Sequence, residues 1–385
     1  MSRSTLLRLS AAAAVACGLA ACSDPSPTPA QPPSPAPAQP PAPPPAQPTA
    51  TALPAPAIGD PPPLAVPPVA DTGNPPSDPR AAAINSASAP ATGVASGPDP
   101  ALVRTEVLLD RAHVSPGVID GRPGDNLRNA VAAFEQAHGL PADGRPDEQL
   151  LKALTDADPG PAIVSYVISQ DDVKGPFVAQ IPKDYAEMAK LDRLGFTSPL
   201  EALAEKFHMD EALLQALNPG ADFGRAGSTI LVAAVGPASL PAPVAAVEVD
   251  KAARQVRAFA ADGRLLAAYP ATVGSTERPA PSGDFTVKGV ARDPVYTYDP
   301  SRLTFGPRSK GKLTIRPGPN NPVGAVWIDL SVPTYGIHGA PESKLVGKVA
   351  SHGCVRLTNW DARQLAAAVK PGTKVSFVGE TASRS

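Results

Sequence analysis

The chain has 385 residues, 51 of them proline, and its 34 basic and 36 acidic side chains leave a formal net charge of −2. A nucleic-acid-binding surface needs an excess of basic residues, which this composition excludes. A membrane-spanning helix needs about 18 or more consecutive apolar residues, and the sequence contains no such run.

The amino terminus has the pattern of an export signal. Two arginines precede the stretch Leu9–Ala21, which is apolar or small apart from one serine and is too short to span a bilayer. It ends in Leu-Ala-Ala-Cys at Cys22, which resembles a bacterial lipobox. The resemblance implies cleavage after residues 1–21 and lipidation of Cys22, and Ser23 favours the outer membrane. We therefore expect a periplasmic, lipid-anchored protein; an ordinary signal peptide with a chance cysteine is the alternative.

A proline-rich stretch follows the cysteine. Residues 22–100 contain 26 of the 51 prolines and show no apolar periodicity. Such a segment cannot bury enough apolar surface to offset the entropy lost on ordering. We expect a disordered linker between the lipid and the folded part of the chain.

The first folded segment, residues 101–157, has three stretches of helical periodicity. We expect helices at about 101–112, 126–138 and 147–154, the second of them capped by Asp125. The tetrapeptide Asp-Gly-Arg-Pro occurs at Asp120 and again at Asp143, as a turn that leads into a helix each time. The pattern resembles a three-helix peptidoglycan-binding domain, which implies peptidoglycan as a partner. A small helical spacer is the alternative.

The second segment, residues 161–237, reads as strand, helix, helix, strand. The strands are predicted at 163–168 and 229–233, with helices from Pro199 to Phe207 and from Asp210 to Leu217. This order resembles a LysM sugar-binding module. Gln170 to Thr197 reads as an insertion, and Gln170-Asp171-Asp172 replaces the usual Gly-Asp-Thr start of such a module. Glycan binding and a structural spacer therefore both stay open.

The third segment, residues 243–378, alternates apolar and polar residues in several short runs, which predicts a mostly-β domain with a closed or sandwiched sheet. One helix is expected at about 360–369, capped by Asn359 or Asp361. Trp327 lies in an apolar strand and is expected in the core. The isolated residues His113, His138 and His208 are expected at the surface or at helix ends.

Two polar clusters in the third segment carry the candidate chemistry. One is Ile-His-Gly around His338, and the other is Ser-His-Gly-Cys-Val-Arg at residues 351–356. Once the signal is removed and Cys22 is lipidated, Cys354 is the one free thiol. A thiol beside a histidine that favours its thiolate form is a candidate nucleophile with a base. Gly353 permits a tight turn, and Arg356 suits a substrate carboxylate.

At these residues the segment resembles the L,D-transpeptidase catalytic domain (YkuD-type), which also has a counterpart of Pro281-Ser282-Gly283-Asp284-Phe285. The resemblance implies Cys354 as nucleophile and His338 as proton donor and acceptor. It implies that Ser351 and His352 shape the site and that the Gly353 and Cys354 amides bind the oxyanion. Arg356, Gly339 and Asn359 are then expected to bind substrate.

No cofactor and no metal are expected. The alternatives for this cluster are a zinc site made of His338, His352 and Cys354, and a buried, inert cysteine. The expected reaction is attack on a tetrapeptide stem of peptidoglycan, release of D-Ala through a thioester, and transfer to an amine acceptor that the sequence leaves open. An L,D-carboxypeptidase or wall amidase with the same acyl-enzyme, and a non-catalytic peptidoglycan-binding lipoprotein tether, are the alternative functions.

Overall fold

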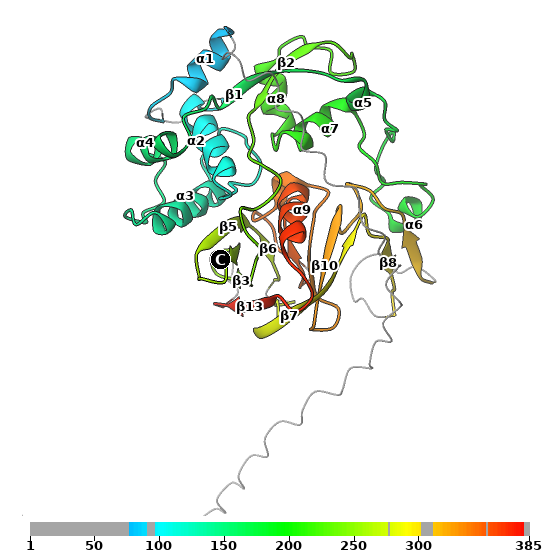
Figure 1. Ribbon diagram of the computed structural model, residues 1–385. Helices are drawn as coiled ribbons and strands as arrows, with labels where there is room; N and C mark the ends of the chain where they lie inside the picture. Colours follow the sequence, from blue (N-terminus) through cyan, green and yellow to red (C-terminus); the bar gives the residue numbers. More distant parts are fainter. Residues whose placement is uncertain (1–76, 91–96, 276–277, 302–310, 352, 381–385) are drawn as a thin grey trace, which may run out of the picture. The chain divides into compact units, whose positions relative to one another are not determined.

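The computed structural model describes residues 77–90, 97–275, 278–301, 311–351 and 353–380, all within one unit of the chain, residues 55–385. Its largest element is a nine-stranded sheet (Figure 1). In order across the sheet the strands are β5 (Leu265–Pro270), β4 (Gln255–Phe259), β3 (Ala246–Asp250), β13 (Lys374–Val378), β7 (Gly283–Arg292), β10 (Val326–Leu330), β11 (Gly336–His338), β12 (Val355–Arg356) and β6 (Thr272–Val273).

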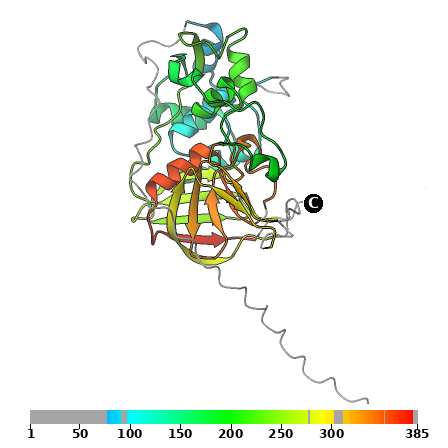
Figure 2. The same ribbon diagram turned by 90° about the vertical axis from the view of Figure 1, so that its right-hand side faces the viewer.

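The sheet curves back on itself. β5 and β6 stand at opposite ends of the strand order, yet Ala271 alone separates them in the chain. One residue spans less than 4 Å, so the two edges must come together. Figure 2 shows the strands wrapping round a common interior. The predicted mostly-β fold is confirmed.

The interior of the sheet is filled by alternate residues of its strands, such as Val247 and Val249 on β3 and Ile328 on β10. The helix α9 (Asn359–Ala368) adds Leu365 to this core and contacts β10 and β11. The expected cap at Asn359 or Asp361 is wrong. The N-cap is Thr358, whose hydroxyl accepts the Asp361 N–H at 3.2 Å because its backbone is extended there.

Three helices form the first folded segment, as predicted: α2 (Pro100–Arg111), α3 (Asp125–Ala137) and α4 (Glu148–Ala157). Asp125 does not cap α3. It lies in the first turn, and Gly124 is the N-cap without a side-chain bond. The repeated Asp-Gly pair is explained by φ values of +68° at Gly121 and +71° at Gly144, which favour glycine.

The second segment pairs β1 (Ile163–Val167) with β2 (Thr229–Ala233) and places α7 (Pro199–Lys206) and α8 (Glu211–Leu217) between them in the chain. The predicted order is therefore present. The inserted stretch adds two short helices, α5 (Gln170–Val173) and α6 (Tyr185–Met188).

One part of the expected disordered linker is folded. Residues Pro79–Asn85 form the helix α1, and Ala81 and Ile84 are buried in the core of the second segment. Asn85 also exchanges two hydrogen bonds with the backbone of Ile163. The linker prediction missed this helix because its seven residues are too few to show helical periodicity and are buried against a strand much later in the chain. Residues 22–76 of that linker lie outside the described part.

A separate two-stranded ribbon pairs β8 (Tyr296–Tyr298) with β9 (Leu313–Ile315). A 3-10 turn, η1, spans Ser343–Leu345. Among the helices that the structure describes, none combines the length and the hydropathy needed to cross a bilayer.

Candidate active site

Two neighbouring parallel strands carry the two polar clusters. Ile337 of β11 aligns with Val355 of β12, and His338 aligns with Arg356. Ile337 and Val355 are buried in the interior of the sheet. Because side chains alternate along a strand, His338 and Arg356 project from the opposite face. The structure therefore brings together residues that the sequence separates by more than a dozen positions.

His338 is held in one orientation. Its side chain is buried, its Nδ1 donates to the Gly339 carbonyl at 2.7 Å, and its ring stacks on Trp327 with centroids 5.3 Å apart. A second backbone hydrogen bond, to Val323, also favours the protonated form of the ring. Burial, followed by the charge of Arg356, lowers the pKa of His338 to about 4. The imidazole is therefore neutral at physiological pH.

Cys354 lies directly before β12 and is partly exposed. Its Sγ is 3.9 Å from the Thr334 carbonyl oxygen and also contacts the N–H of Gly336, at the start of the strand that carries His338. Burial raises the pKa of the Cys354 thiol, an effect that the Gly336 N–H and Arg356 partly offset. The resting group is a thiol, rather than the thiolate that the sequence reasoning expected from a histidine neighbour.

The turn before Cys354 is braced by Ser351. This buried serine donates from Oγ to the Cys354 carbonyl at 2.6 Å and accepts the Gly353 N–H at 3.3 Å. Gly353 has φ +115°, and a Cβ there would lie 3.1 Å from the Tyr335 ring. The turn therefore requires glycine. In this structure an oxyanion would have to replace Ser351 as the acceptor of the Gly353 N–H.

Arg356 supplies the positive charge of the site. Its Nε is buried and has no hydrogen-bond partner in the part of the chain that the structure describes. A buried guanidinium nitrogen without a partner is costly unless a ligand satisfies it. Its charge acts on the pKa of both His338 and Cys354, so the three groups form one electrostatic unit.

Three tyrosines, which we call the tyrosine wall, lie beside this unit: Tyr296 and Tyr298 of β8, and Tyr185 of α6. The ring of Tyr185 meets Tyr298 edge to face at 5.1 Å and Tyr296 at 5.8 Å. Burial raises the pKa of Tyr296, and Tyr185 and Cys354 add to that shift. The charge of Arg356 acts on the pKa of Tyr185 as well. The wall therefore borders the nucleophile.

Tyr185 is the site residue that sequence reasoning missed. It lies in the stretch between Gln170 and Thr197, which reads as an insertion in a different segment. The end of this insertion also contacts the third segment, since the Leu194 N–H donates to the Pro317 carbonyl at 2.9 Å. No local motif marks Tyr185, because its proximity to Arg356 depends on how the two segments pack.

The structure does not support substrate contact by Asn359 or Gly339. Asn359 is 1% exposed, its Oδ1 accepts the Ala325 N–H at 2.9 Å and its Nδ2 donates to the Pro319 carbonyl at 3.2 Å. A Cβ on Gly339 would collide with that same amide oxygen. Both residues instead fix the backbone that follows His338.

One expectation about a single residue is wrong, and another holds in part. Trp327 is part-exposed rather than in the core. It pairs with His338 across β10 and β11, and both side chains project from the face of the sheet away from the core, where the rings stack. His208 lies at a helix end, as expected, directly after the C-cap of α7. It is also part-buried, and its Nδ1 lies 2.8 Å from the buried carboxylate of Asp110. Neither partner is near in sequence, so periodicity could not reveal them.

Cys22, the expected lipidation site, and His352, which was expected to shape the active site, lie outside the described residues. Within the described ranges, no three His, Cys, Asp or Glu side chains are grouped closely enough to hold a metal ion.

Comparison with known proteins gives two family matches. Residues 245–376 match the model of the L,D-transpeptidase catalytic domain (YkuD), and residues 102–154 match a "Putative peptidoglycan binding domain". A "Putative L,D-transpeptidase YkuD" of Bacillus licheniformis is 33% identical over 182 residues, which cover 46% of this chain and 92% of that protein.

The namesake protein of Bacillus subtilis is 28% identical over 180 residues, which cover 46% of this chain and 92% of that protein. Among solved structures, L,D-transpeptidase 3 from Mycobacterium tuberculosis is 18% identical with a TM-score of 0.30, over 40% of this chain and 76% of that one.

Proposed function

The chain belongs to the L,D-transpeptidase family, and we propose that it transfers peptidoglycan stem peptides through a thioester at Cys354. The observation that carries this proposal is the register of β11 and β12. It aligns His338 with Arg356, while the Cys354 sulfur lies against the first residue of β11.

The first step is acylation. Neutral His338 takes the thiol proton as the Cys354 sulfur attacks the carbonyl carbon of the third stem residue of a tetrapeptide. Backbone N–H groups at Gly353 and Cys354 hold the oxyanion of the tetrahedral intermediate. The C–N bond then breaks, the thioester forms, and D-Ala leaves with the proton that His338 held. Sulfur thus replaces nitrogen on the acyl carbon, and the thiol proton ends on the amine of D-Ala.

Arg356 and the tyrosine wall position the donor. The unpartnered Nε of Arg356 suits a peptide carboxylate, because a charge-assisted hydrogen bond satisfies the buried nitrogen. In the second step an incoming amine attacks the thioester, and its nitrogen bonds to the acyl carbon while His338 accepts its proton. The C–S bond then breaks, and His338 returns the proton to the Cys354 sulfur, which regenerates the thiol.

The test is acylation of the protein by a soluble tetrapeptide stem, followed by intact mass. We expect a mass gain equal to the tripeptide acyl group, its loss in Cys354→Ala, and its retention in the matched variant Cys22→Ala. A Cys354→Ala protein that still gains the acyl mass would exclude this nucleophile.

We also propose that Cys22 carries lipid and that the enzyme works in the periplasm, tethered to the outer membrane. The proposal rests on the lipobox-like sequence at Cys22, and the peptidoglycan-binding match at residues 102–154 agrees with a partner in the wall. Fractionation of cells tests it. Wild-type protein should sediment with outer membranes, and Cys22→Ala should be released into the soluble periplasmic fraction.

A further inference from the structure

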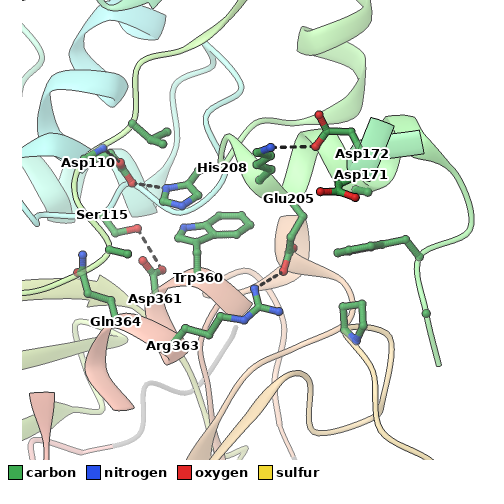
Figure 3. Close-up of a pocket in the computed structure, with 18 of the residues that line it drawn as sticks. Asp110, Ser115, Asp171, Asp172, Glu205, His208, Trp360, Asp361, Arg363 and Gln364 are labelled. Carbon is green, nitrogen blue, oxygen red and sulfur yellow. Dashed lines mark hydrogen bonds and ion pairs between the residues drawn. The ribbon is translucent and has the colours of Figure 1, made fainter. Parts of the chain in front are cut away.

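A cavity separate from the Cys354 site lies where the three folded segments meet (Figure 3). We call it the junction pocket. Its volume is about 590 Å³, and its walls come from the end of α2, from the second segment with its insertion, and from α9. Cys354, His338 and Arg356 do not line it. A pocket of this size holds a drug-sized molecule or one to two sugar rings.

The charged groups of the junction pocket are largely paired with one another, as the dashed lines of Figure 3 show. Three ion pairs border the cavity: Asp110 with His208 at 2.8 Å, Asp172 with Lys206 at 2.8 Å, and Glu205 with Arg363 at 3.4 Å. Internal pairing leaves little net charge to attract an ion. Each partner nevertheless keeps lone pairs or N–H groups that can bond a neutral polar ligand.

Asp361 adds a group that can both donate and accept. Its Oδ2 accepts a hydrogen bond of 3.1 Å from the Ser115 hydroxyl, which also lines the pocket (Figure 3). Burial raises the pKa of Asp361 to about 7. The carboxyl is therefore partly protonated near neutral pH and does not place a full negative charge in the cavity.

Aromatic side chains supply the apolar part of the lining. Phe177 and Phe196 are part-exposed, and the Val178 N–H bonds the Phe196 carbonyl at 2.9 Å, which keeps the two chain segments together. The Trp360 indole stacks on His208 with centroids 4.8 Å apart. Its Nε1–H is buried and has no hydrogen-bond partner within the described ranges.

We propose that the junction pocket binds one or two rings of a neutral glycan. The C–H faces of a sugar ring pack on aromatic side chains, and its hydroxyls bond the paired charged groups around them, where charged partners make the stronger hydrogen bonds. That the glycan is the N-acetylated backbone of peptidoglycan rests on the function proposed above. The site belongs to none of the three segments alone, so it exists only when they are docked.

The test is calorimetric titration of the full chain with chitotetraose, a soluble N-acetylglucosamine oligomer. We expect saturable binding by the wild type and at least tenfold weaker binding by Phe177→Ala. The matched control is Phe223→Ala, which removes a similar half-buried ring that packs on the core of the second segment but does not line the pocket. This control should keep the wild-type dissociation constant.

Three results would overturn the inference or part of it. Absence of chitotetraose binding to the wild type would exclude the site, and loss of binding in Phe223→Ala but not in Phe177→Ala would move it elsewhere. Equal affinity for cellotetraose would exclude an N-acetylated glycan. Acylation of the unaltered protein by a sugar-free tetrapeptide is measured separately, and its failure would count against the transpeptidase proposal while leaving sugar binding unaffected.

Discussion

Tyr185 and Tyr298 pack edge to face, with ring centroids 5.1 Å apart and ring planes at 73°. Tyr298 belongs to the ribbon beside Cys354, whereas Tyr185 belongs to the insertion of the second segment. A segment outside the catalytic match of residues 245–376 thus contributes to the wall of the proposed active site.

Removing this ring should weaken donor binding more than it slows the chemistry. An aromatic pair contributes about 0.5–1.5 kcal/mol beyond its buried area, so we expect Tyr185→Ala to raise KM for a tetrapeptide by roughly three- to tenfold, with kcat changed less. Tyr185→Phe keeps the ring and should stay within about twofold of the wild type. Steady-state release of D-Ala measures both constants, and an unchanged KM in Tyr185→Ala would exclude donor contact by the wall.

Arg356 should control the pH dependence of the thiol. Its positive charge favours the Cys354 thiolate and disfavours the His338 imidazolium, so Arg356→Gln should raise the pKa of both groups. Because thiolate is the reactive form, the rate of alkylation by iodoacetamide plotted against pH should shift to higher pH. The wild-type curve should show no inflection near pH 6.5, since the pKa of His338 is about 4.

The matched control for that experiment is Arg292→Gln, which removes an exposed arginine at the end of β7. Its alkylation curve should overlay that of the wild type. If both arginine variants shift the curve equally, a general change in net charge explains the effect and Arg356 has no special role.

Gly353 should be intolerant of a side chain. Its φ of +115° costs a non-glycine residue on the order of 1–3 kcal/mol, and the new Cβ would press on Tyr335. The neighbouring Cys354 would be displaced, and a misplacement of about 1 Å can cost about 100-fold in rate. Gly353→Ala should therefore acylate at least about 100-fold more slowly.

Gly372→Ala provides the comparison, because φ is +90° there and nothing lies within 4 Å of an added Cβ. It should lower the melting temperature through backbone strain and leave the acylation rate close to that of the wild type. Comparable rate losses in both variants would mean that strain, rather than displacement of Cys354, is responsible.

Asp361 should make the fold less stable as pH rises. The pKa of this carboxyl is about 7 in the folded protein, against 3.8 as its ordinary value, because of burial. Between these values the folded state holds a proton that the unfolded chain has released. Protonated Asp361 therefore makes its full contribution to the free energy of unfolding below about pH 4. This contribution is lost as pH rises through 7.

Asp361→Asn removes the titration and can keep the bond from Ser115. We expect the variant to match the wild type near pH 4 and to be more stable at pH 8, by up to about 4 kcal/mol at 1.36 kcal/mol per pKa unit. Urea midpoints at the two pH values measure this difference. Asp262→Asn, in an exposed turn, should shift both midpoints equally; a pH-independent effect of Asp361→Asn would contradict the raised pKa.

Local patterns predicted the elements of this protein well where spacing in the chain reflects geometry. Helical periodicity located α2, α3 and α4, and the alternation in β3 located a core strand. The helix α1 was missed because its burial depends on β1, a strand that follows much later in the chain. Caps at Gly124 and Thr358 were misassigned by one residue or more because several polar candidates stood side by side.

The amino-acid sequence by itself determined the chemistry available to this protein: a thiol, a histidine and an arginine in two short clusters, each beside a glycine that the backbone requires. The tertiary structure decided the protonation states of these groups and which other residues surround them. Burial keeps Cys354 a thiol against the opposing charge of Arg356, and burial together with that charge keeps the His338 imidazole neutral. Segment packing brings Tyr185 to the cleft and creates the junction pocket. Such effects depend on distances across the fold, which a linear pattern of residues does not contain.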